Sequence, residues 1–416
     1  MTPASLRRRA GLTAGIAAAA GVLVVLAGGA GPPVPAAATN AGMVVTGLDN
    51  PRGLAVDDDG RLYVAEAGHG GPFCLRTGEL GPECFGMTSR ISVVAPGDGH
   101  RRTVVGGLPS IGTALGANGA DGVAVERDRL LAILTSSPAH LPEDPCNTPT
   151  PPGSRPSASP SLVSPDCPRV LAEVGRLLGD LIEVRDGRVR SLAEVGGYDY
   201  DWVVRHKATL GPNNPDWRPG DAKPYALAVG ADRIYVVDAS ANTLDVVDRF
   251  GNVRVPKDDA GHPVYFPNPA GPIGRFPYAA MPTCVAVAGR SVYVGSLSGG
   301  VWRWDGHRVS LVAGRANGLT ALNGCATDSH GNLYVSNVFG LAGSLYAPRT
   351  GSVLKVTADG SVSTVAAGLN FPAGIAVAGD ALFVAVNSVC PEDLKLIDRN
   401  DPKFCDATGA ILRLPL

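Results

Sequence analysis

The stretch Gly47–Gly68, GLDNPRGLAVDDDGRLYVAEAG, is the pattern from which the fold of this chain can be inferred. It predicts a strand over Gly53–Val56, a tight turn over Asp57–Gly60 and a second strand over Leu62–Glu66, because apolar runs bounded by turn residues are typical of β-hairpins. Glycine supplies a positive φ in such turns, and aspartate bonds to its own backbone. One hairpin cannot bury its faces alone, so we expect the chain to contain further copies.

Five further copies occur along the chain. Each is a short apolar strand, a turn and a second strand, usually with an aromatic residue beside valine. The copies begin at Ala120 (ADGVAVERDRLLAIL), Tyr225 (YALAVGADRIYVVD), Thr283 (TCVAVAGRSVYVGS), Gly324 (GCATDSHGNLYVSN) and Ala373 (AGIAVAGDALFVAV). The alternative, accidental similarity among segments rich in valine, alanine and glycine, does not account for six copies in one register. Such repetition indicates a repeat architecture.

A second pair of strands follows each of the first five hairpins, but the sixth is followed by one strand only, Ala410–Leu414. The missing strand is at the other end of the chain, where MVVTGLDNPRG from Met43 matches STVAAGLNFPAG from Ser363, the segment before the sixth hairpin. We therefore expect Met43–Thr46 to be the outer strand of the last blade. The prediction is an all-β, six-bladed β-propeller, closed by pairing of the N-terminal and C-terminal strands in one blade.

The first 38 residues have the features of a signal peptide. Arg7, Arg8 and Arg9 precede an apolar run over Gly11–Ala30, and Ala36-Ala37-Ala38 offers a cleavage site. We expect residues 1–38 to be removed and residues 39–416 to form a single secreted propeller domain. A retained N-terminal anchor is the alternative, and general secretory and twin-arginine export are not distinguished. No later stretch is long and apolar enough to span a bilayer.

The composition is that of a globular protein with little net charge. The chain has 416 residues, 45% of them hydrophobic and 18% charged, and a net charge of -2. This balance gives no electrostatic case for binding nucleic acid or an anionic membrane. We expect a monomer whose partner is a small molecule, a glycan or a protein.

Eight cysteines in an exported chain predict disulfides. Three pairs are local in sequence, and each would close a loop: Cys74 with Cys84, Cys146 with Cys167, and Cys390 with Cys405. Cys284 and Cys325 share one register in adjacent repeats. They could bond across blades or remain two buried thiols, and the sequence leaves both alternatives open.

The long loops all fall on one face of the predicted propeller. In an up-and-down blade, the loop before the first strand and the loop after the second strand share a face. The long segments cover about residues 67–88, 137–174, 196–224, 256–282, 338–350 and 388–408. Elaboration of one face of a repeat protein is typical of a binding face, although loops also lengthen without function. Two features stand out within them, a Pro/Ser-rich lobe over Glu143–Pro168 that we expect to be disordered and a short helix over Trp202–Lys207.

Several segments together resemble the ScyD/ScyE family. They are GLDNPRGLA, LYVAEAG, CLRTG with GPECFG, GGLPS, EVGGYD with NNPD and AKPYALAV, and NFPAGIAV. The resemblance covers nearly all of residues 39–416. The family consists of exported propeller-type proteins named after proteins encoded with scytonemin biosynthetic genes. The single repeats are also similar to NHL repeats and to the gluconolactonase-like group. The resemblance implies an exported propeller and no defined reaction.

Oxygen-bearing side chains gather at the predicted strand ends on the loop-rich face. The second strands end at Glu66, Leu134, Asp238, Ser296, Asn337 and Val386. Hard cations such as Ca²⁺ prefer carboxylate and amide oxygens, so Glu66, Asp238 and Asn337 are candidate ligands of a Ca²⁺ ion. Just before first strands on the same face lie the candidate binding residues Asn50, Asp221, Asn323 and Asn370. The alternative is that Asp and Asn at these positions cap the following turns.

Two functions follow from these features. The first is a binding scaffold without catalysis that uses the loop-rich face. The alternative is a metal (calcium)-dependent hydrolase or lactonase with its site at the central mouth of the propeller, where a cation polarises a carbonyl. His206 and His262, in loops of that face, are the histidines considered as a general base, with plain surface positions as the alternative for each. A G-x-S-x-G motif is absent from the sequence, so a serine hydrolase has no support.

Overall fold

The computed structural model describes residues 42–78, 81–95, 99–113, 116–141, 146, 166–210, 222–266, 280–340, 347–394 and 405–416. The predicted signal peptide (1–38), Asp221 and most of the lobe Glu143–Pro168 lie outside these ranges. The described strands belong to one compact unit, Ala36–Leu416.

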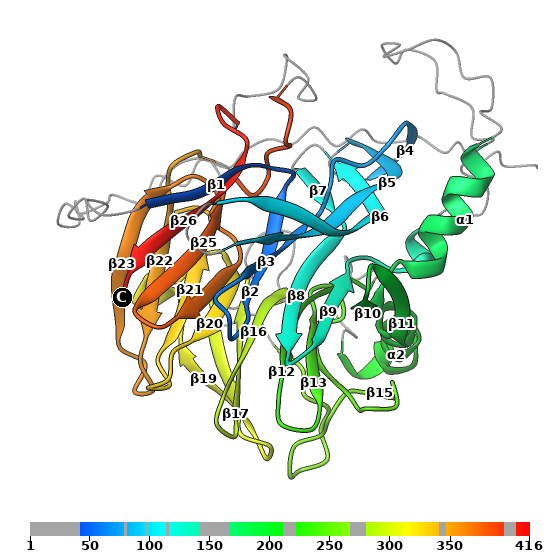
Figure 1. The fold of residues 1–416 in the computed structure, drawn as a ribbon. Helices are drawn as coiled ribbons and strands as arrows, with labels where there is room; N and C mark the ends of the chain where they lie inside the picture. Colours follow the sequence, from blue (N-terminus) through cyan, green and yellow to red (C-terminus); the bar gives the residue numbers. More distant parts are fainter. Residues whose placement is uncertain are drawn as a thin grey trace, which may run out of the picture. The chain divides into compact units, whose positions relative to one another are not determined.

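The strands form six antiparallel sheets, the blades of a β-propeller (Figure 1). Blade 1 contains β2 (Pro51–Val56), β3 (Leu62–Glu66), β5 (Gly81–Val94) and β6 (Arg101–Thr113), with β4 (Phe73–Gly78) and β7 (Gly116–Asn118) attached. Blade 2 contains β8 (Ala120–Glu126), β9 (Arg129–Leu134), β10 (Asp180–Arg185) and β11 (Arg188–Glu194). Blade 3 contains β12 (Pro224–Val229), β13 (Ile234–Asp238), β14 (Thr243–Val247) and β15 (Val253–Arg254).

The remaining blades follow the same order. Blade 4 contains β16 (Pro282–Ala288), β17 (Ser291–Ser296), β18 (Val301–Trp304) and β19 (Val309–Ala313). Blade 5 contains β20 (Leu322–Thr327), β21 (Leu333–Asn337), β22 (Gly351–Val356) and β23 (Val362–Leu369). Blade 6 contains β24 (Ile375–Ala378), β25 (Ala381–Val386), β26 (Gly409–Pro415) and the N-terminal strand β1 (Gly42–Leu48). The all-β, six-bladed propeller predicted from the hairpins is therefore confirmed.

The first and last strands of the propeller lie side by side. In Figure 1, β1 (blue) runs along β26 (red), and the two pair antiparallel with Thr46 opposite Ala410. On the inner side, the backbone N–H of Gly374 donates a 2.6 Å hydrogen bond to the carbonyl oxygen of Arg52, which joins blade 6 to blade 1. A Cβ on Gly374 would lie 2.2 Å from that oxygen, so glycine is required for this close approach.

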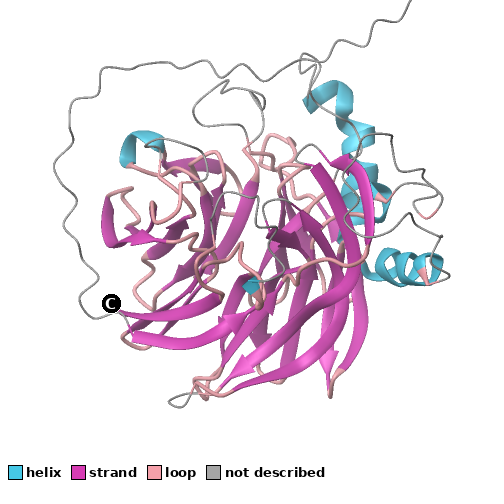
Figure 2. Ribbon diagram, turned by 90° about the horizontal axis from the view of Figure 1, so that it is seen from above, coloured by secondary structure: helices cyan, strands magenta, loops and turns pink. Residues whose placement is uncertain are grey.

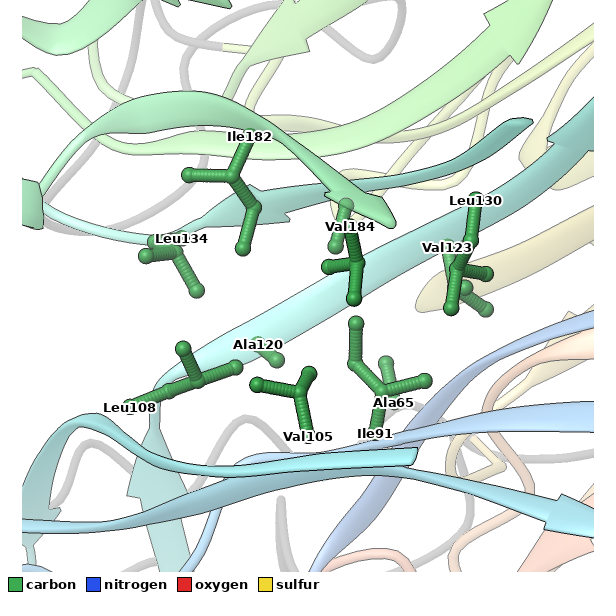
Figure 3. Packing of buried hydrophobic residues seen from close by; sticks show 11 residues of the cluster. Ala65, Ile91, Val105, Leu108, Ala120, Val123, Leu130, Leu134, Ile182 and Val184 are labelled. Carbon is green, nitrogen blue, oxygen red and sulfur yellow. The ribbon is translucent and has the colours of Figure 1, made fainter. Parts of the chain in front are cut away.

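The hydrophobic core is divided among the six interfaces between neighbouring blades. For each pair of neighbours, including blades 6 and 1, the described residues form a buried apolar cluster. In Figure 3, Ile91, Val105 and Leu108 of blade 1 face Val123 and Ile182 of blade 2. Strands with apolar residues on both faces can be buried only between two other layers. This packing explains why a single hairpin of this sequence cannot stand alone.

Local chemistry forms the hairpins as predicted. Asp57 Oδ1 accepts hydrogen bonds from the backbone N–H groups of Asp59 (3.1 Å) and Arg61 (2.9 Å), and Gly60 has a φ of 78°. Trp302 and Trp304 are buried in the cluster between blades 3 and 4, so these aromatic side chains pack between blades.

Among the described elements, two α-helices and two long strands of blade 1 add to the repeated blades. Helix α1 (Cys167–Leu177) packs on β5 and β6, which are 14 and 13 residues long and exceed the other described strands in length. The predicted helix Trp202–Lys207 is present but longer, as α2 (Val195–Leu210). Two short 3₁₀ turns, Pro138–His140 and Arg315–Asn317, complete the described elements. Figure 2 shows the helices beside the strands of the blades. Neither α-helix has the length and apolar character needed to cross a membrane.

All eight cysteines are paired. The three predicted loop disulfides, Cys74–Cys84, Cys146–Cys167 and Cys390–Cys405, are present. Cys284 on β16 bonds to Cys325 on β20, which decides the alternative that the sequence left open. This bond joins the innermost strands of blades 4 and 5. Four disulfides are typical of a protein of an oxidising, extracellular environment.

Candidate functional site

A repeated irregularity marks the start of five innermost strands. In β2, β8, β12, β16 and β20, the pairing with the second strand shifts by one residue shortly after the first position. Such a bulge redirects a side chain away from the normal alternation of a strand. The residues that follow the first position in these strands are Arg52, Asp121, Tyr225, Thr283 and Asn323. All five are polar, and they come from five different blades.

Four of these side chains meet at the mouth of the propeller axis, and we call them the mouth residues: Arg52, Asp121, Tyr225 and Asn323. Asn323 Nδ2 donates a 2.8 Å hydrogen bond to the hydroxyl of Tyr225. Asn323 lies on β20 of blade 5 and Tyr225 on β12 of blade 3, with β16 of blade 4 between them. The bond therefore spans the mouth between two blades that are not neighbours. Arg52 Nε lies 3.7 Å from Asp121 Oδ1, and Arg52 Nη2 donates to the carbonyl of Ala117 (2.8 Å).

Burial changes the acid–base properties of the mouth residues. Removal from water raises the pKa of Asp121 to about 6, although the Arg52 guanidinium opposes this shift. Burial likewise raises the pKa of Tyr225, whose ring also feels the charges of Arg52 and Asp121. The mouth therefore combines a cation, a carboxyl group that titrates in the weakly acidic range, a phenol and an amide.

The second strands end where the sequence predicted, at Glu66, Leu134, Asp238, Ser296, Asn337 and Val386. Glu66 is fully buried, and its partners are cations and donors of blade 1. Its Oε2 accepts hydrogen bonds from Arg90 Nη2 (2.8 Å) and the backbone N–H of Asp49 (2.7 Å), and Arg101 Nη1 lies 3.4 Å away. Ser92 donates to Oε1.

Asp238 and Asn337 also bond within their own blades. Asp238 Oδ1 accepts from the backbone N–H groups of Ser240 (2.8 Å) and Ala241 (2.6 Å), as the turn-capping alternative anticipates. Asn337 Oδ1 accepts from the N–H of Thr320 at 3.0 Å. Each of the three candidate Ca²⁺ ligands thus takes part in hydrogen bonds at the end of its own second strand. That they share a cation stays a prediction.

The predicted binding residues have separate surroundings. Asn323 belongs to the mouth residues. Asn50 is buried with a φ of 51°, and its Nδ2 donates to the carbonyl of Gly68 at 2.8 Å. Asn370 Nδ2 donates to Asn387 Oδ1 (2.9 Å), which fastens two loops of blade 6. Asp221 lies outside the described residues.

A histidine that the sequence reading did not single out is oriented by a buried carboxylate. His69 Nδ1 lies 2.6 Å from Oδ2 of the fully buried Asp49, and this bond raises the pKa of His69. Glu392 completes a group whose potential ligand atoms all lie within 4.8 Å of one another. Its carboxylate also pairs with Arg90, with Nη2 and Oε2 2.5 Å apart. Asp49 and Glu392 are 343 positions apart in the sequence, so only the fold brings this group together.

The two histidines that were considered as a general base have other environments. His206 Nδ1 bonds to the carbonyl oxygen of Trp202 (2.8 Å), and its ring stacks on that tryptophan. His262 is exposed in a turn beside Asp258.

Comparison with known proteins shows no family for this chain. No family model matches the chain, and no curated protein matches it. The chain is similar to a gluconolactonase from Xanthomonas campestris (13% identity, 90% of this chain and 89% of that one, TM-score 0.46). It is also similar to a putative glucose dehydrogenase from Thermus thermophilus (15%, 90% and 99%, TM-score 0.47) and to virginiamycin B lyase from Staphylococcus aureus (11%, 83% and 81%, TM-score 0.41). Likenesses this distant carry no argument about function.

Proposed function

We propose that this protein is an exported, ScyD/ScyE-like binding propeller that takes a small hydroxyl-bearing molecule, such as a saccharide, at the mouth residues. The observation that carries the proposal is the meeting of Arg52, Asp121, Tyr225 and Asn323 from four blades, with the Tyr225–Asn323 hydrogen bond spanning the mouth. Binding sites typically place a few convergent polar groups at such a position in the fold. The loops of the same face supply the surrounding surface, and the four disulfides support an extracellular location.

The chemistry of the mouth residues fits hydroxyl groups. A hydroxyl group both donates and accepts hydrogen bonds. The Arg52 guanidinium and the Asn323 amide nitrogen are donors, whereas the Asp121 carboxylate and the Tyr225 oxygen can accept. A neutral polyol or a sugar acid can therefore satisfy this set, and Arg52 favours a ligand that carries a carboxylate.

Isothermal titration calorimetry with a panel of hexoses, uronic acids and short oligosaccharides tests the proposal. We expect at least one member to bind, and we expect Tyr225→Phe to weaken that binding up to about tenfold, the effect of losing one hydrogen bond. Tyr235→Phe is the matched control, because Tyr235 lies on β13 of the same blade and packs against Trp304. The proposal fails if no member binds, or if both variants bind as the unchanged protein does.

A second candidate function is a metal-assisted hydrolase or lactonase. The group of Asp49, His69 and Glu392 favours it, because the three side chains could hold a cation such as Ca²⁺ or a transition metal at the loop-rich face. Arg90 competes with a cation for Glu392. Hydrolysis of aldonolactones should then occur, be abolished by EDTA and be lost in His69→Gln. Absence of hydrolysis with added Ca²⁺, Mn²⁺ or Zn²⁺ would remove this candidate.

A further inference from the structure

Three fully buried aspartates lie together at blade 3, apart from the mouth residues. Asp238 ends β13 and Asp245 lies within β14, whereas Asp199 comes from helix α2. All three are 0% exposed. The Asp199 carboxyl lies within hydrogen-bonding reach of both other carboxyls. We call these residues the aspartate cluster.

The Asp199 side chain is directed at the two blade residues without any donor to satisfy it. Neither of its carboxyl oxygens accepts a hydrogen bond from an amide, hydroxyl or cationic group of the described residues, and the same holds for Asp245 Oδ1. The other oxygen of Asp245 accepts a 3.2 Å hydrogen bond from the Thr243 hydroxyl. Buried polar atoms in native proteins almost always have a partner, so three such oxygens in one place require an explanation.

Two other buried carboxyl groups of the protein lie beside cations. Glu66 pairs with Arg90, and Asp121 faces Arg52. Among the ion pairs of the described residues, none involves Asp199 or Asp245. A buried carboxylate without a counter-charge is strongly unfavourable. Asp199 and Asp245 therefore differ from Glu66 and Asp121.

The helix that carries Asp199 is fixed against the blade, so the carboxyl cannot simply turn toward water. Trp202 and Val203 of α2 pack on Ala241 and Val255 in a buried apolar cluster. The backbone N–H of Val255 also donates to the Tyr198 hydroxyl at 3.3 Å. These contacts flank Asp199 and hold it over Asp238 and Asp245.

We propose that the aspartate cluster binds one divalent cation, of which Ca²⁺ fits best, and that this ion fastens helix α2 to blade 3. The unpartnered oxygens of Asp199 and Asp245 are the ligands the cluster offers, with Asp238 beside them. Ca²⁺ favours carboxylate, carbonyl and water oxygens in adaptable geometry, whereas Mg²⁺ demands near-ideal octahedral coordination and retains its water. A buried, irregular set of carboxylates therefore suits Ca²⁺ better. The site is distinct from Asp49, His69 and Glu392, which belong to blade 1 and the loop after β25.

Thermal unfolding and calorimetry with Ca²⁺ as the probe test the proposal on the purified, disulfide-bonded protein. We expect Ca²⁺ to bind with a stoichiometry of about one, to raise the melting temperature relative to EDTA, and to slow hydrogen exchange of the α2 amides. Mg²⁺ should act more weakly. In Asp199→Asn these Ca²⁺ effects should disappear. In EDTA this variant should unfold at the same temperature as the unchanged protein or higher, because the substitution removes a buried charge.

Two control variants and one rival outcome make the test decisive. Asp201→Asn changes an exposed aspartate on the same helix and should retain the full Ca²⁺ effect. If His69→Gln abolishes the Ca²⁺ effect and Asp199→Asn does not, the ion binds at the other group and the proposal is overturned. The proposal also fails if Ca²⁺ changes nothing. In that case the melting temperature in EDTA should rise on acidification, and Asp199→Asn should remove this rise. That result would show that the carboxyl groups share protons rather than an ion.

Discussion

At the scale of single residues, the candidate binding site depends on where five bulges fall. A strand without a bulge would direct alternate side chains toward the neighbouring blades. The extra residue in β2, β8, β12 and β20 instead lets Arg52, Asp121, Tyr225 and Asn323 meet at the axis. Burial then changes their chemistry, above all that of Asp121.

The pKa of Asp121 predicts a specific pH dependence of stability. Because its pKa rises from 3.8 to about 6 on folding, the folded state binds more protons than the unfolded state between these values. The contribution of Asp121 to the free energy of unfolding is therefore complete below about pH 4 and is lost as the pH rises through 6. Asp121→Asn should remove this dependence, so the stability of the variant relative to the unchanged protein should increase by up to about 3 kcal/mol between pH 4 and pH 7.

Urea unfolding at several pH values measures this difference. Asp128→Asn, an exposed change in the turn of the same hairpin, is the control and should give a constant offset. A constant offset for Asp121→Asn as well would contradict the raised pKa.

At the scale of elements, neighbouring blades are joined by apolar packing and, in one place, by a covalent bond. The Cys284–Cys325 disulfide links β16 to β20 across 41 positions. A Cβ on Gly295 of β17 would lie 2.6 Å from Cys284 Sγ, so the strand leaves room for the bond only because it has glycine there.

Removal of this disulfide should destabilise the protein more than removal of a loop disulfide. Loop-closure entropy predicts a loss of about 4 kcal/mol for Cys284→Ala with Cys325→Ala, and about 3 kcal/mol for Cys74→Ala with Cys84→Ala, whose cysteines are 10 positions apart. Cys284 is also buried, whereas Cys74 is exposed, so the first pair loses packing as well. Denaturant unfolding of the two double variants compares the losses directly. An equal or smaller loss of unfolding free energy for the Cys284/Cys325 double variant would show that the bond between blades adds no stability beyond that of the packing.

At the scale of the whole propeller, the pairing of β1 with β26 completes the four-stranded sheet of the last blade with a strand from the other end of the chain. A chain that begins at Asp49 lacks β1 and leaves β26 with an unpaired edge, which favours association with other chains. We expect this variant to aggregate or to melt at a much lower temperature, whereas a chain that begins at Gly42 should remain monomeric. Size-exclusion chromatography with thermal unfolding separates the two outcomes. If both truncated chains are equally stable and monomeric, β1 has no part in closing the ring.

Local patterns along the chain were enough to predict the six hairpins, the ends of their second strands and three of the disulfides. These features follow from local rules, because alternation, turn residues and short loop closure act over a few positions. The same patterns also placed the oxygen-bearing ends of β3, β13 and β21 on one face.

Which polar side chains meet depends on how distant parts of the chain pack together. Glu66 was expected to hold a cation, but Arg90 and Arg101 already lie beside it. Asn323 was expected to bind a ligand, whereas Arg52, Asp121 and Tyr225 were not singled out, because a one-residue bulge has no sequence signature in these strands. Asp199 reaches Asp238 and Asp245 only through the packing of α2 on blade 3. Side-chain partners far apart in sequence depend on bulges, helix docking and burial, and local patterns do not encode these.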